Sequence, residues 1–362
     1  MGLRNLNKTL KKYCKDGIKE INMRDLRNKT IAIDTSIYLY KYTFNGNLIE
    51  CFIKQINHFL KYNITPVYLL DGKPTDEKRD LINKRKEAYN NKKEKIKKLL
   101  EDKLNIEKEI ELLKNNNDEE KNEVIKDQLD KYFLEINLIN ETIKKKQKGN
   151  IKVDWSKVCL LKELFKECNI FYYQCNGETD VFVKEFFNNK LIDYVITEDL
   201  DFLTHNCSNI LYNYNFMNNT LLHYNYDIIL KELELTKEVF IDFCILCGCD
   251  YSPTVRGIGY VTAFKLIKKY KTIEEIIKNN KKFDFNNFSY EKSRKMFNLY
   301  HEINISYKQI QINKKENYNV FRTNLFELLK DEKIQMNHIE DLINNLKSLT
   351  YKKKINSILN YL

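Results

Sequence analysis

The stretch VITEDLDFLTH, residues 195–205, indicates the fold because a buried strand changes into a group of acids within it. Its apolar start is typical of a strand, and Glu198, Asp199 and Asp201 follow at once. Side chains two residues apart share one face of extended backbone, so Asp199 and Asp201 would repel each other unless a cation lay between them. The alternative is a solvated strand-to-loop corner without function. The rest of the chain decides between these interpretations.

Short apolar runs alternate with helical patterns along most of the chain, which is typical of a parallel sheet covered by helices. The predicted strands are TIAID, PVYLLDG, FYYQC, DYVITED and NILYN, at residues 30–34, 66–72, 171–175, 193–199 and 209–213. Residues 155–168 and 178–189 carry apolar side chains three and four positions apart and are predicted helices. The sequence therefore predicts an α/β fold.

Acids stand where the predicted strands end. TIAID ends in Asp34, and PVYLLD ends in Asp71. Because ligands of open parallel sheets bind beyond the carboxyl ends of the strands, we expect these acids to meet at one edge. The start of a predicted helix and the segment ILCGCDY bring further acids to the same place. The full set is Asp34, Asp71, Glu178, Asp180, Asp199, Asp201 and Asp250.

Carboxylates gathered within reach of each other cannot all ionise without cations. Carboxylate oxygens suit Mg²⁺ or Mn²⁺, which are hard ions. Two such ions about 4 Å apart can activate a water and stabilise the leaving oxygen in phosphodiester hydrolysis. The formal net charge of +11 favours a polyanionic partner. The pattern therefore predicts a metal-dependent site on a protein that binds a phosphate backbone.

Composition limits the class of protein. The chain has 362 residues, of which 43% are hydrophobic, so it is globular rather than disordered. It contains no apolar run long enough for a membrane span and no apolar segment of a signal peptide at its start. Its nine cysteines are therefore expected to be the reduced thiols of an intracellular protein. Cys244, Cys247 and Cys249 lie close together, but no second Cys or His pair stands at zinc-ligand spacing, which favours core cysteines over a zinc site.

Residues 76–150 differ from the rest of the chain. They are dense in Lys and Glu, and they carry Leu and Ile at helical spacing on both sides of the polar break NNNDEE. This pattern predicts two helices folded back on each other. The alternative is a solvated coiled-coil insertion without chemistry.

A series of motifs resembles the flap endonuclease family, a group of structure-specific nucleases that includes the XPG-type repair nucleases. The motifs are MGLRNL, IAIDTSIYLYKY, PVYLLDGKP, GETDVFVKEFF, VITEDLDFLTH, FCILCGCDY and RGIGYVTAFKLI, in that order. The resemblance implies a PIN-like parallel sheet with a helical arch insertion and a C-terminal helix–two-turn–helix region. It divides the chain into nuclease regions at 1–90 and 151–252, the arch at 91–150, and a DNA-binding helical region at 253–362.

By this resemblance, the acids hold two Mg²⁺ ions, which Mn²⁺ can replace. One ion would be held by Asp34, Asp71, Glu178 and Asp180, and the second would be surrounded by Asp199, Asp201 and Asp250. Asp180 stands where most relatives have Glu, so a water is expected to bridge it to the ion. Lys78 and Arg85, which share one face of a predicted helix, would grip the scissile phosphate. Ordinary surface charge is the alternative for this pair.

The resemblance also implies contacts with DNA. Tyr40 matches an aromatic that stacks on a base, and a core tyrosine is the alternative. Gly257 and Gly259 open the helix of RGIGYVTAFKLI, where the family grips duplex DNA beside a bound K⁺. Lys41 and Lys54 are candidate substitutes for basic residues that are missing nearby. The candidate DNA contacts are Tyr40, Lys41, Lys54, Glu178, Gly248, Asp250, Gly257 and Gly259.

The implied activity is hydrolysis of DNA at 5′ flaps, nicks, junctions or 5′ ends in replication and repair. The expected form is a monomer in the nucleus, or at a cytoplasmic replication site if the source is viral. A Holliday-junction resolvase or 5′–3′ exonuclease of the same superfamily is the nearest alternative. A 5′ exoribonuclease is more distant, and a catalytically silent DNA-binding scaffold belongs to another class.

Two departures from the family pattern limit the implied partners. The interval between Asp34 and Asp71 lacks the acidic loop that closes over a 3′ flap in relatives, so strict double-flap selection is not expected. The residues up to the final SILNYL lack the aromatic motif that binds the sliding clamp, so a clamp partner is not expected either.

Overall fold

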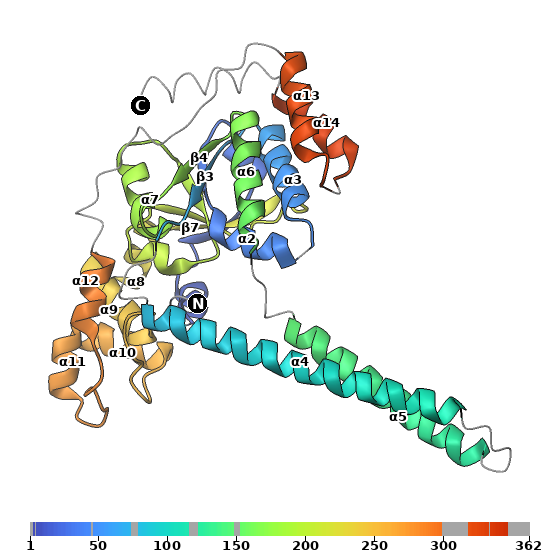
Figure 1. Ribbon diagram of the computed structural model, residues 1–362. Helices are drawn as coiled ribbons and strands as arrows, with labels where there is room; N and C mark the ends of the chain where they lie inside the picture. Colours follow the sequence, from blue (N-terminus) through green and yellow to red (C-terminus); the bar gives the residue numbers. More distant parts are fainter. Residues whose placement is uncertain are drawn as a thin grey trace. The chain divides into compact units, whose positions relative to one another are not determined.

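The computed structural model describes residues 3, 5–44, 46–73, 79–115, 122–147, 153–298, 318–332 and 334–346. The chain forms two compact units (Figure 1). The larger unit comprises residues 1–78 and 154–362, and the smaller one comprises residues 79–153. Among the described residues, no helix has the length and apolar character needed to cross a membrane.

The larger unit is built on a mixed sheet. Its strands are β1 (Ile18–Asn22), β2 (Thr30–Asp34), β3 (Thr65–Leu70), β4 (Phe171–Gln174), β5 (Tyr194–Ile196), β6 (Asn209–Tyr212) and β7 (Thr220–Asn225). Within the described residues, the order across the sheet is β1-β7-β6-β5-β2-β3-β4. The strands from β6 to β4 are parallel, while β7 runs antiparallel to both β6 and β1.

All five strands predicted from apolar runs are confirmed, and two were missed. The missed strands, β1 and β7, have the sequences IKEIN and TLLHYN. Both are partly exposed along their length, so they lack the continuous apolar run of a strand that is buried on both faces. They form the antiparallel edge, in which Ile18 pairs with Tyr224 and Asn22 pairs with Thr220.

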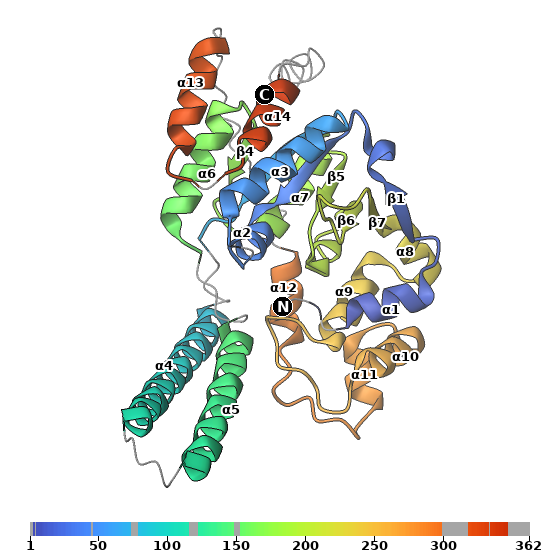
Figure 2. The ribbon, with the colours of Figure 1, turned by 90° about the vertical axis from the view of Figure 1, so that its right-hand side faces the viewer.

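Helices cover both faces of the sheet (Figures 1 and 2). On one face lie α2 (Thr35–Phe44), α3 (Leu48–Lys61) and α6 (Trp155–Glu167), whose Phe165 stacks on Tyr68 with ring centroids 4.4 Å apart. On the other face lies α7 (Thr179–Asn188), whose Phe186 meets Tyr173 edge to face. All residues of β3 are buried, and their side chains point alternately to the two faces of the sheet. Tyr68 lies on the face covered by α6. The predicted helices at 155–168 and 178–189 are thereby confirmed as α6 and α7.

The core continues into a group of helices beyond the sheet. These are α1 (Leu6–Tyr13), α8 (Tyr226–Leu233), α9 (Lys237–Cys247), α10 (Tyr260–Tyr270), α11 (Ile273–Asn279) and α12 (Tyr290–Phe297). Gly257, with φ 85°, adopts a left-handed conformation in the turn that leads to α10. Cys244 and Cys247 are buried in α9, which confirms them as core cysteines.

The last described helices return to the helical face of the sheet. α13 (Tyr318–Leu329) packs on α6, and α14 (Met336–Leu346) packs on α3. Asn57 of α3 donates to the main-chain oxygen of His338 at 2.9 Å. Glu50 accepts from the His338 ring at 3.0 Å, so α14 is held to α3 by polar contacts as well as by buried Leu342.

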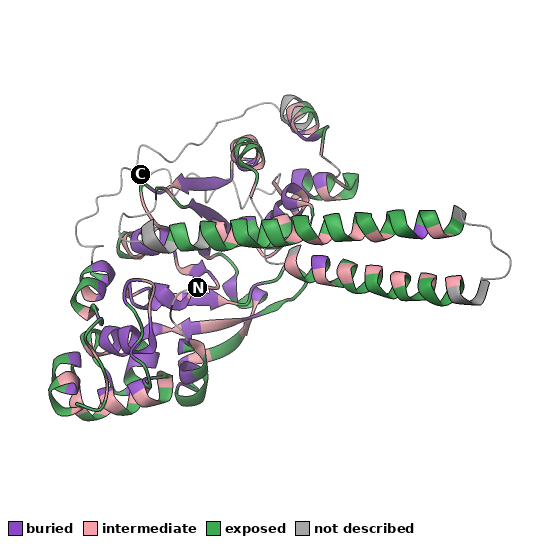
Figure 3. Cartoon of the chain, turned by 60° about the horizontal axis from the view of Figure 1, so that its bottom comes forward, coloured by how far each residue is buried: buried purple, intermediate pink, exposed green. Residues whose placement is uncertain are grey.

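The smaller unit is a helical hairpin of α4 (Arg79–Asn115) and α5 (Asn122–Gln147), which confirms the prediction of two helices folded back on each other. Most of its surface is exposed or half-buried (Figure 3). Ile110 and Ile143 are its buried side chains among the residues described, and Lys114 lies 5.7 Å from the Phe133 ring centroid. The hairpin is therefore stabilised by a narrow apolar seam with solvated outer faces.

Candidate metal centre

The predicted acids are collected by the parallel strands. Asp34 is the last residue of β2, and Asp71 directly follows β3. Glu178 and Asp180 open α7 after β4, and the 3₁₀ turn Leu200–Leu203 after β5 begins at its N-cap, Asp199, and contains Asp201. Because β2, β3, β4 and β5 are parallel, their carboxyl ends meet at one edge of the sheet. The structure therefore places these acids at the same edge.

The acids at this edge influence each other electrostatically. Asp34 is 6% exposed, and burial raises its pKa well above the usual range, with the charges of Asp71, Asp199 and Asp180 adding to the rise. Asp201 is 3% exposed, and its pKa is raised well above the usual range by burial and then by Asp199 and Asp180. The five side chains lie at the same carboxyl edge of the sheet, and the group can be fully ionised only when cations compensate it.

Hydrogen bonds orient part of this cluster. The Thr197 hydroxyl donates to Asp34 Oδ2 at 2.8 Å and accepts from the Asp199 N–H at 3.0 Å. Asp199 Oδ1 accepts from the Asp201 N–H at 3.0 Å. Asp201 Oδ1 in turn accepts from the N–H of Leu3 at 2.7 Å. The segment VITED thus supplies a fully buried threonine as well as acids, and the sequence analysis missed its role.

Asp71 is held by a residue 108 positions further along the chain. The N–H and the hydroxyl of Thr179 donate to the same oxygen of Asp71, at 2.8 and 2.7 Å. The two loops that carry them approach closely at Gly72, where an added Cβ would lie 2.1 Å from the main-chain oxygen of Cys175. The Gly72 N–H donates to the Gly177 oxygen at 2.7 Å. Gly72 and Thr179 are functional candidates that no spacing in the sequence revealed.

Glu178 and Asp250 are half-buried at the border of the cluster. Glu178 is the N-cap residue of α7. Asp250 follows Cys249, whose pKa is raised by burial and to a lesser extent by the charge of Asp201. The charge of Asp201 thus acts on the residue directly before Asp250.

The donor set fits hard divalent cations. It consists of carboxylate oxygens, which are the ligands that Mg²⁺ and Mn²⁺ prefer. Within the described ranges, no three His, Cys, Asp or Glu side chains already converge at ligand distances. Mg²⁺ usually takes only one or two carboxylates directly and keeps several waters, so a looser cluster of acids suits it.

The structure does not describe where the side chains of the two predicted phosphate-binding residues, Lys78 and Arg85, lie relative to the acids. Lys78 lies outside the described residues, and Arg85 is on α4, where its side chain lies outside them as well. Both belong to the junction between the two units or to the hairpin. Their role as phosphate ligands stays a prediction.

The candidate DNA-contact residues differ in exposure and in whether other protein groups already contact them. Tyr40 is 56% exposed on α2, so the interpretation as a core tyrosine is wrong. Lys41 Nζ donates to the Tyr214 oxygen at 3.2 Å, and Lys54 Nζ pairs with Glu50 at 3.2 Å, so protein groups already hold both ammoniums. Gly248 is the C-cap residue of α9, and its φ of 105° is a positive value that favours glycine over other residues. Gly259 is the N-cap residue of α10.

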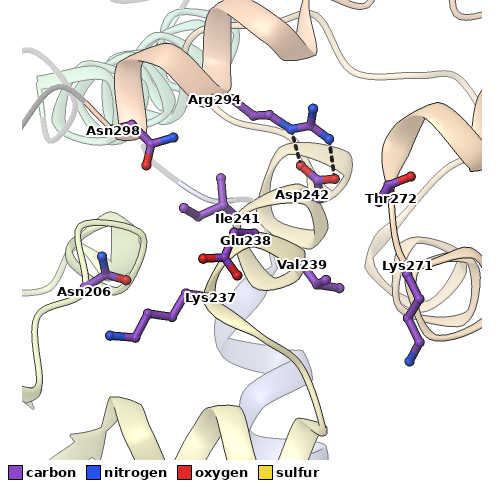
Figure 4. Close-up of a pocket in the computed structure, with 10 residues that line it drawn as sticks. All are labelled: Asn206, Lys237, Glu238, Val239, Ile241, Asp242, Lys271, Thr272, Arg294 and Asn298. Carbon is purple, nitrogen blue, oxygen red and sulfur yellow. Dashed lines mark hydrogen bonds and ion pairs between the residues drawn. The ribbon is translucent and has the colours of Figure 1, made fainter.

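A pocket of about 340 Å³ lies apart from the predicted acids, between α9, α11 and α12 (Figure 4). Arg294 crosses it and pairs with Asp242 at 2.5 Å and with Glu274 at 2.6 Å. The pocket is lined by Asn206, Lys237, Glu238, Val239, Ile241, Asp242, Lys271, Thr272, Arg294 and Asn298. None of the predicted acids lines the pocket, and the ion pairs of Arg294 join the helices around it.

Comparisons with known families match the two parts of the chain that carry the acids. The family model described as the XPG N-terminal domain matches residues 1–92, which include Asp34 and Asp71. The model described as the XPG I-region matches residues 169–250, which include the other five acids.

Curated relatives extend the similarity over most of the chain. A probable RAD2-like endonuclease of Invertebrate iridescent virus 6 is 29% identical over 344 residues, covering 84% of this chain and 81% of its own. Flap endonuclease 1 of Enterocytozoon bieneusi (strain H348) is 28% identical over 316 residues, covering 82% of this chain and 77% of its own.

Solved structures share the fold. The catalytic core of Rad2 in complex with DNA substrate aligns with a TM-score of 0.59 at 17% identity, over 95% of this chain and 100% of that chain. Flap endonuclease-1 from Methanococcus jannaschii aligns with a TM-score of 0.56 at 17% identity, over 93% of this chain and 97% of that one.

Proposed function

We propose that the chain is a structure-specific 5′ nuclease of the XPG family and that it hydrolyses DNA phosphodiesters at 5′ flaps or 5′ ends with two Mg²⁺ ions. The observation that carries the proposal is the cluster of acids at the carboxyl edge of the parallel strands, in which Asp34, Asp180 and Asp201 are buried. Its charges need cations, and the basic chain, with net charge +11, offers a surface that attracts the phosphate backbone.

The acids form two groups, one for each ion. Asp34, Asp71, Glu178 and Asp180 would hold one ion, and Asp199, Asp201 and Asp250 would hold the second. When bound, the ions supply an activated water and charge stabilisation for the leaving oxygen, and Mn²⁺ replaces Mg²⁺. Thr179 and Thr197 keep Asp71 and Asp34 oriented through the hydrogen bonds described above. Asp180 is one methylene shorter than a Glu, so it would contact its ion through a water.

Substrate contacts surround this centre. Lys78 and Arg85 stabilise charge on the scissile phosphate. Tyr40, exposed on α2, stacks on a base, and the main chain at Gly248, Gly257 and Gly259 approaches the backbone of the duplex beside a K⁺ ion. Lys41 and Lys54 contribute positive charge rather than direct contacts, because both are engaged within the protein. The enzyme acts as a monomer, in the nucleus or at a viral replication site.

A panel of substrates tests the proposal against its rivals. Labelled 5′-flap, nicked, gapped, four-way and RNA substrates are incubated with Mg²⁺, and the products are mapped. We expect the 5′ flap to be cut fastest. Preference for the four-way junction would favour the resolvase, preference for a recessed or nicked 5′ end would favour the exonuclease, and preference for RNA would favour the exoribonuclease. Binding without any cleavage would support the silent scaffold.

A further inference from the structure

The chain has a single tryptophan, Trp155, which begins α6 and is 68% exposed. We propose that Trp155 stacks on a base of the single-stranded 5′ arm beside the acid cluster. This inference rests on the proposed function and adds to it a residue that selects for an unpaired arm.

The position of α6 brings the ring to the edge that carries the acids. α6 is followed, after a short turn, by β4, which packs against it, so the two elements run in opposite directions. The first turn of α6 therefore lies at the end of the sheet where β4 finishes. This is the same edge at which β2 and β3 present Asp34 and Asp71.

A chain of side-chain contacts connects the ring to the cluster. Lys162 Nζ lies 5.3 Å from the centroid of the Trp155 ring and donates to Gln174 Oε1 at 2.7 Å. Gln174 Nε2 donates to the main-chain oxygen of Asp71 at 2.7 Å. The tryptophan, the lysine, the glutamine and the acid thus form one supported arrangement within the larger unit.

Local structure does not require an aromatic at this position. Asp154 caps α6 by accepting from the Ser156 N–H at 3.0 Å, so the start of the helix is stabilised without Trp155. The exposed ring does not contribute to the core as a buried aromatic would. What the ring offers is a large π face that Lys162 orients, together with a cation near enough to attract a phosphate.

An unpaired base is the ligand that fits such a face. Bases of a duplex are stacked on their neighbours, whereas bases of a single strand are free to stack on an aromatic side chain without sequence preference. Since the acids cut where single strand meets duplex in the proposed function, a ring at this edge meets the arm and leaves the duplex to the helical region. Trp155 therefore distinguishes a 5′ arm from a nick.

Intrinsic fluorescence tests the inference directly, because only Trp155 contributes tryptophan emission. The wild type is titrated with a 5′-flap substrate and with the same duplex carrying a nick, with Ca²⁺ in place of Mg²⁺ and the DNA checked to be intact. We expect quenching with the flap and little change with the nick. Equal changes with both substrates, or none with either, would overturn the inference.

Variants separate stacking from folding. Trp155→Ala should weaken flap binding between about 5-fold and about 150-fold, the range for one stacked base, while nick binding stays the same. Trp155→Phe keeps a π face and should recover most of the affinity. Lys162→Met should weaken flap binding to a smaller degree. If Trp155→Ala binds flap and nick as the wild type does while still cutting DNA, the inference fails and the proposed nuclease function stands. If the wild type cuts no DNA, it is the proposed function that fails.

Discussion

Thr179 is the residue on which the geometry of Asp71 depends most directly. Two donors from one residue hold a single oxygen of the carboxylate, and Thr179 itself is 2% exposed. Rotation of the carboxylate would break both hydrogen bonds, so the direction of the second oxygen of Asp71 is fixed as well. Such outer contacts commonly set the affinity of a metal site.

Thr179→Val should therefore weaken the affinity of the site for Mg²⁺ without unfolding the protein. Valine keeps the shape and the N–H donor but removes the hydroxyl. We expect the Mg²⁺ concentration for half-maximal cleavage to rise by roughly 10-fold or more, while the melting temperature changes little. Thr179→Ser restores the hydroxyl and serves as the control. A Val variant with an unchanged Mg²⁺ titration would show that the hydroxyl does not support the site.

Asp201→Asn separates the effect of the acid cluster on stability from its role in cleavage. The amide keeps an oxygen that can accept from Leu3 but removes one buried charge from the cluster. We expect cleavage to fall by orders of magnitude with DNA binding retained, because the site loses an ion ligand. In a chelator, the variant should melt at the same temperature as the wild type or higher, since repulsion within the cluster is relieved.

Mg²⁺ should raise the melting temperature of the wild type more than that of Asp201→Asn, because only the wild type has the full ligand set. Scanning calorimetry with and without Mg²⁺ measures both effects. Full cleavage activity of the wild type in a chelator would contradict the assignment of these acids to metal.

Among the elements, α12 packs on its neighbours through buried Met296 and Phe297, and one arginine adds ion pairs to two other helices. Arg294 donates to both oxygens of Asp242 on α9 and to both oxygens of Glu274 on α11. Asp242 is 3% exposed and also accepts from the Ile273 N–H. The pairing with Arg294 lowers the pKa of Glu274 and raises that of the guanidinium. A single cation thus joins these three helices by ion pairs, in addition to their apolar packing.

Arg294→Met should destabilise the helical region by leaving Asp242 buried and unpaired. Breaking a buried pair costs roughly 3–5 kcal/mol, and we expect the lower end because the guanidinium is partly exposed. The double variant Arg294→Met with Asp242→Asn keeps an acceptor for Ile273 and removes the unpaired charge, so it should recover much of the loss. Urea unfolding of the three proteins measures the difference. Equal stability of the single and double variants would show that the lost contacts of arginine, and not the bare carboxylate, set the cost.

At the scale of the whole molecule, the chain combines a nuclease core with a long helical hairpin that packs as its own unit. Lys78 and Arg85 lie where the core passes into this hairpin. If the hairpin arches over the acids and a 5′ single strand threads through it, ordering of the hairpin would deliver these cations to the phosphate. Substrate recognition and catalysis would then be coupled by induced fit.

A protein block on the 5′ arm tests threading. A bulky protein fixed to the flap before the enzyme is added should suppress cutting, whereas the same block added after binding should not. Lys78→Ala and Arg85→Ala should each slow single-turnover cleavage far more than they weaken binding, because both act on the scissile phosphate. Equal rates on blocked and free flaps would mean that the strand does not pass through the hairpin.

Sequence alone determined the buried parallel strands, several of the helices and the acids at the strand ends. Apolar runs such as TIAID are continuous because the strand is buried on both faces, and a parallel sheet puts its ligands beyond the carboxyl ends. The helical period on both sides of NNNDEE likewise predicted α4 and α5. These features are local, since periodicity in a short window reports backbone conformation and burial together.

Tertiary structure decided which distant groups meet. Thr179 reaches Asp71, Leu3 reaches Asp201, and Gly72 lies against Cys175, although more than a hundred residues separate each pair. The exposed position of Tyr40 and Trp155 and the contact of Lys41 with the main-chain oxygen of Tyr214 were equally invisible in the spacing. The physical reason is that such contacts follow from the order of strands in the sheet and the packing of loops beyond it. A single sequence encodes these only through the sum of many weak, long-range interactions.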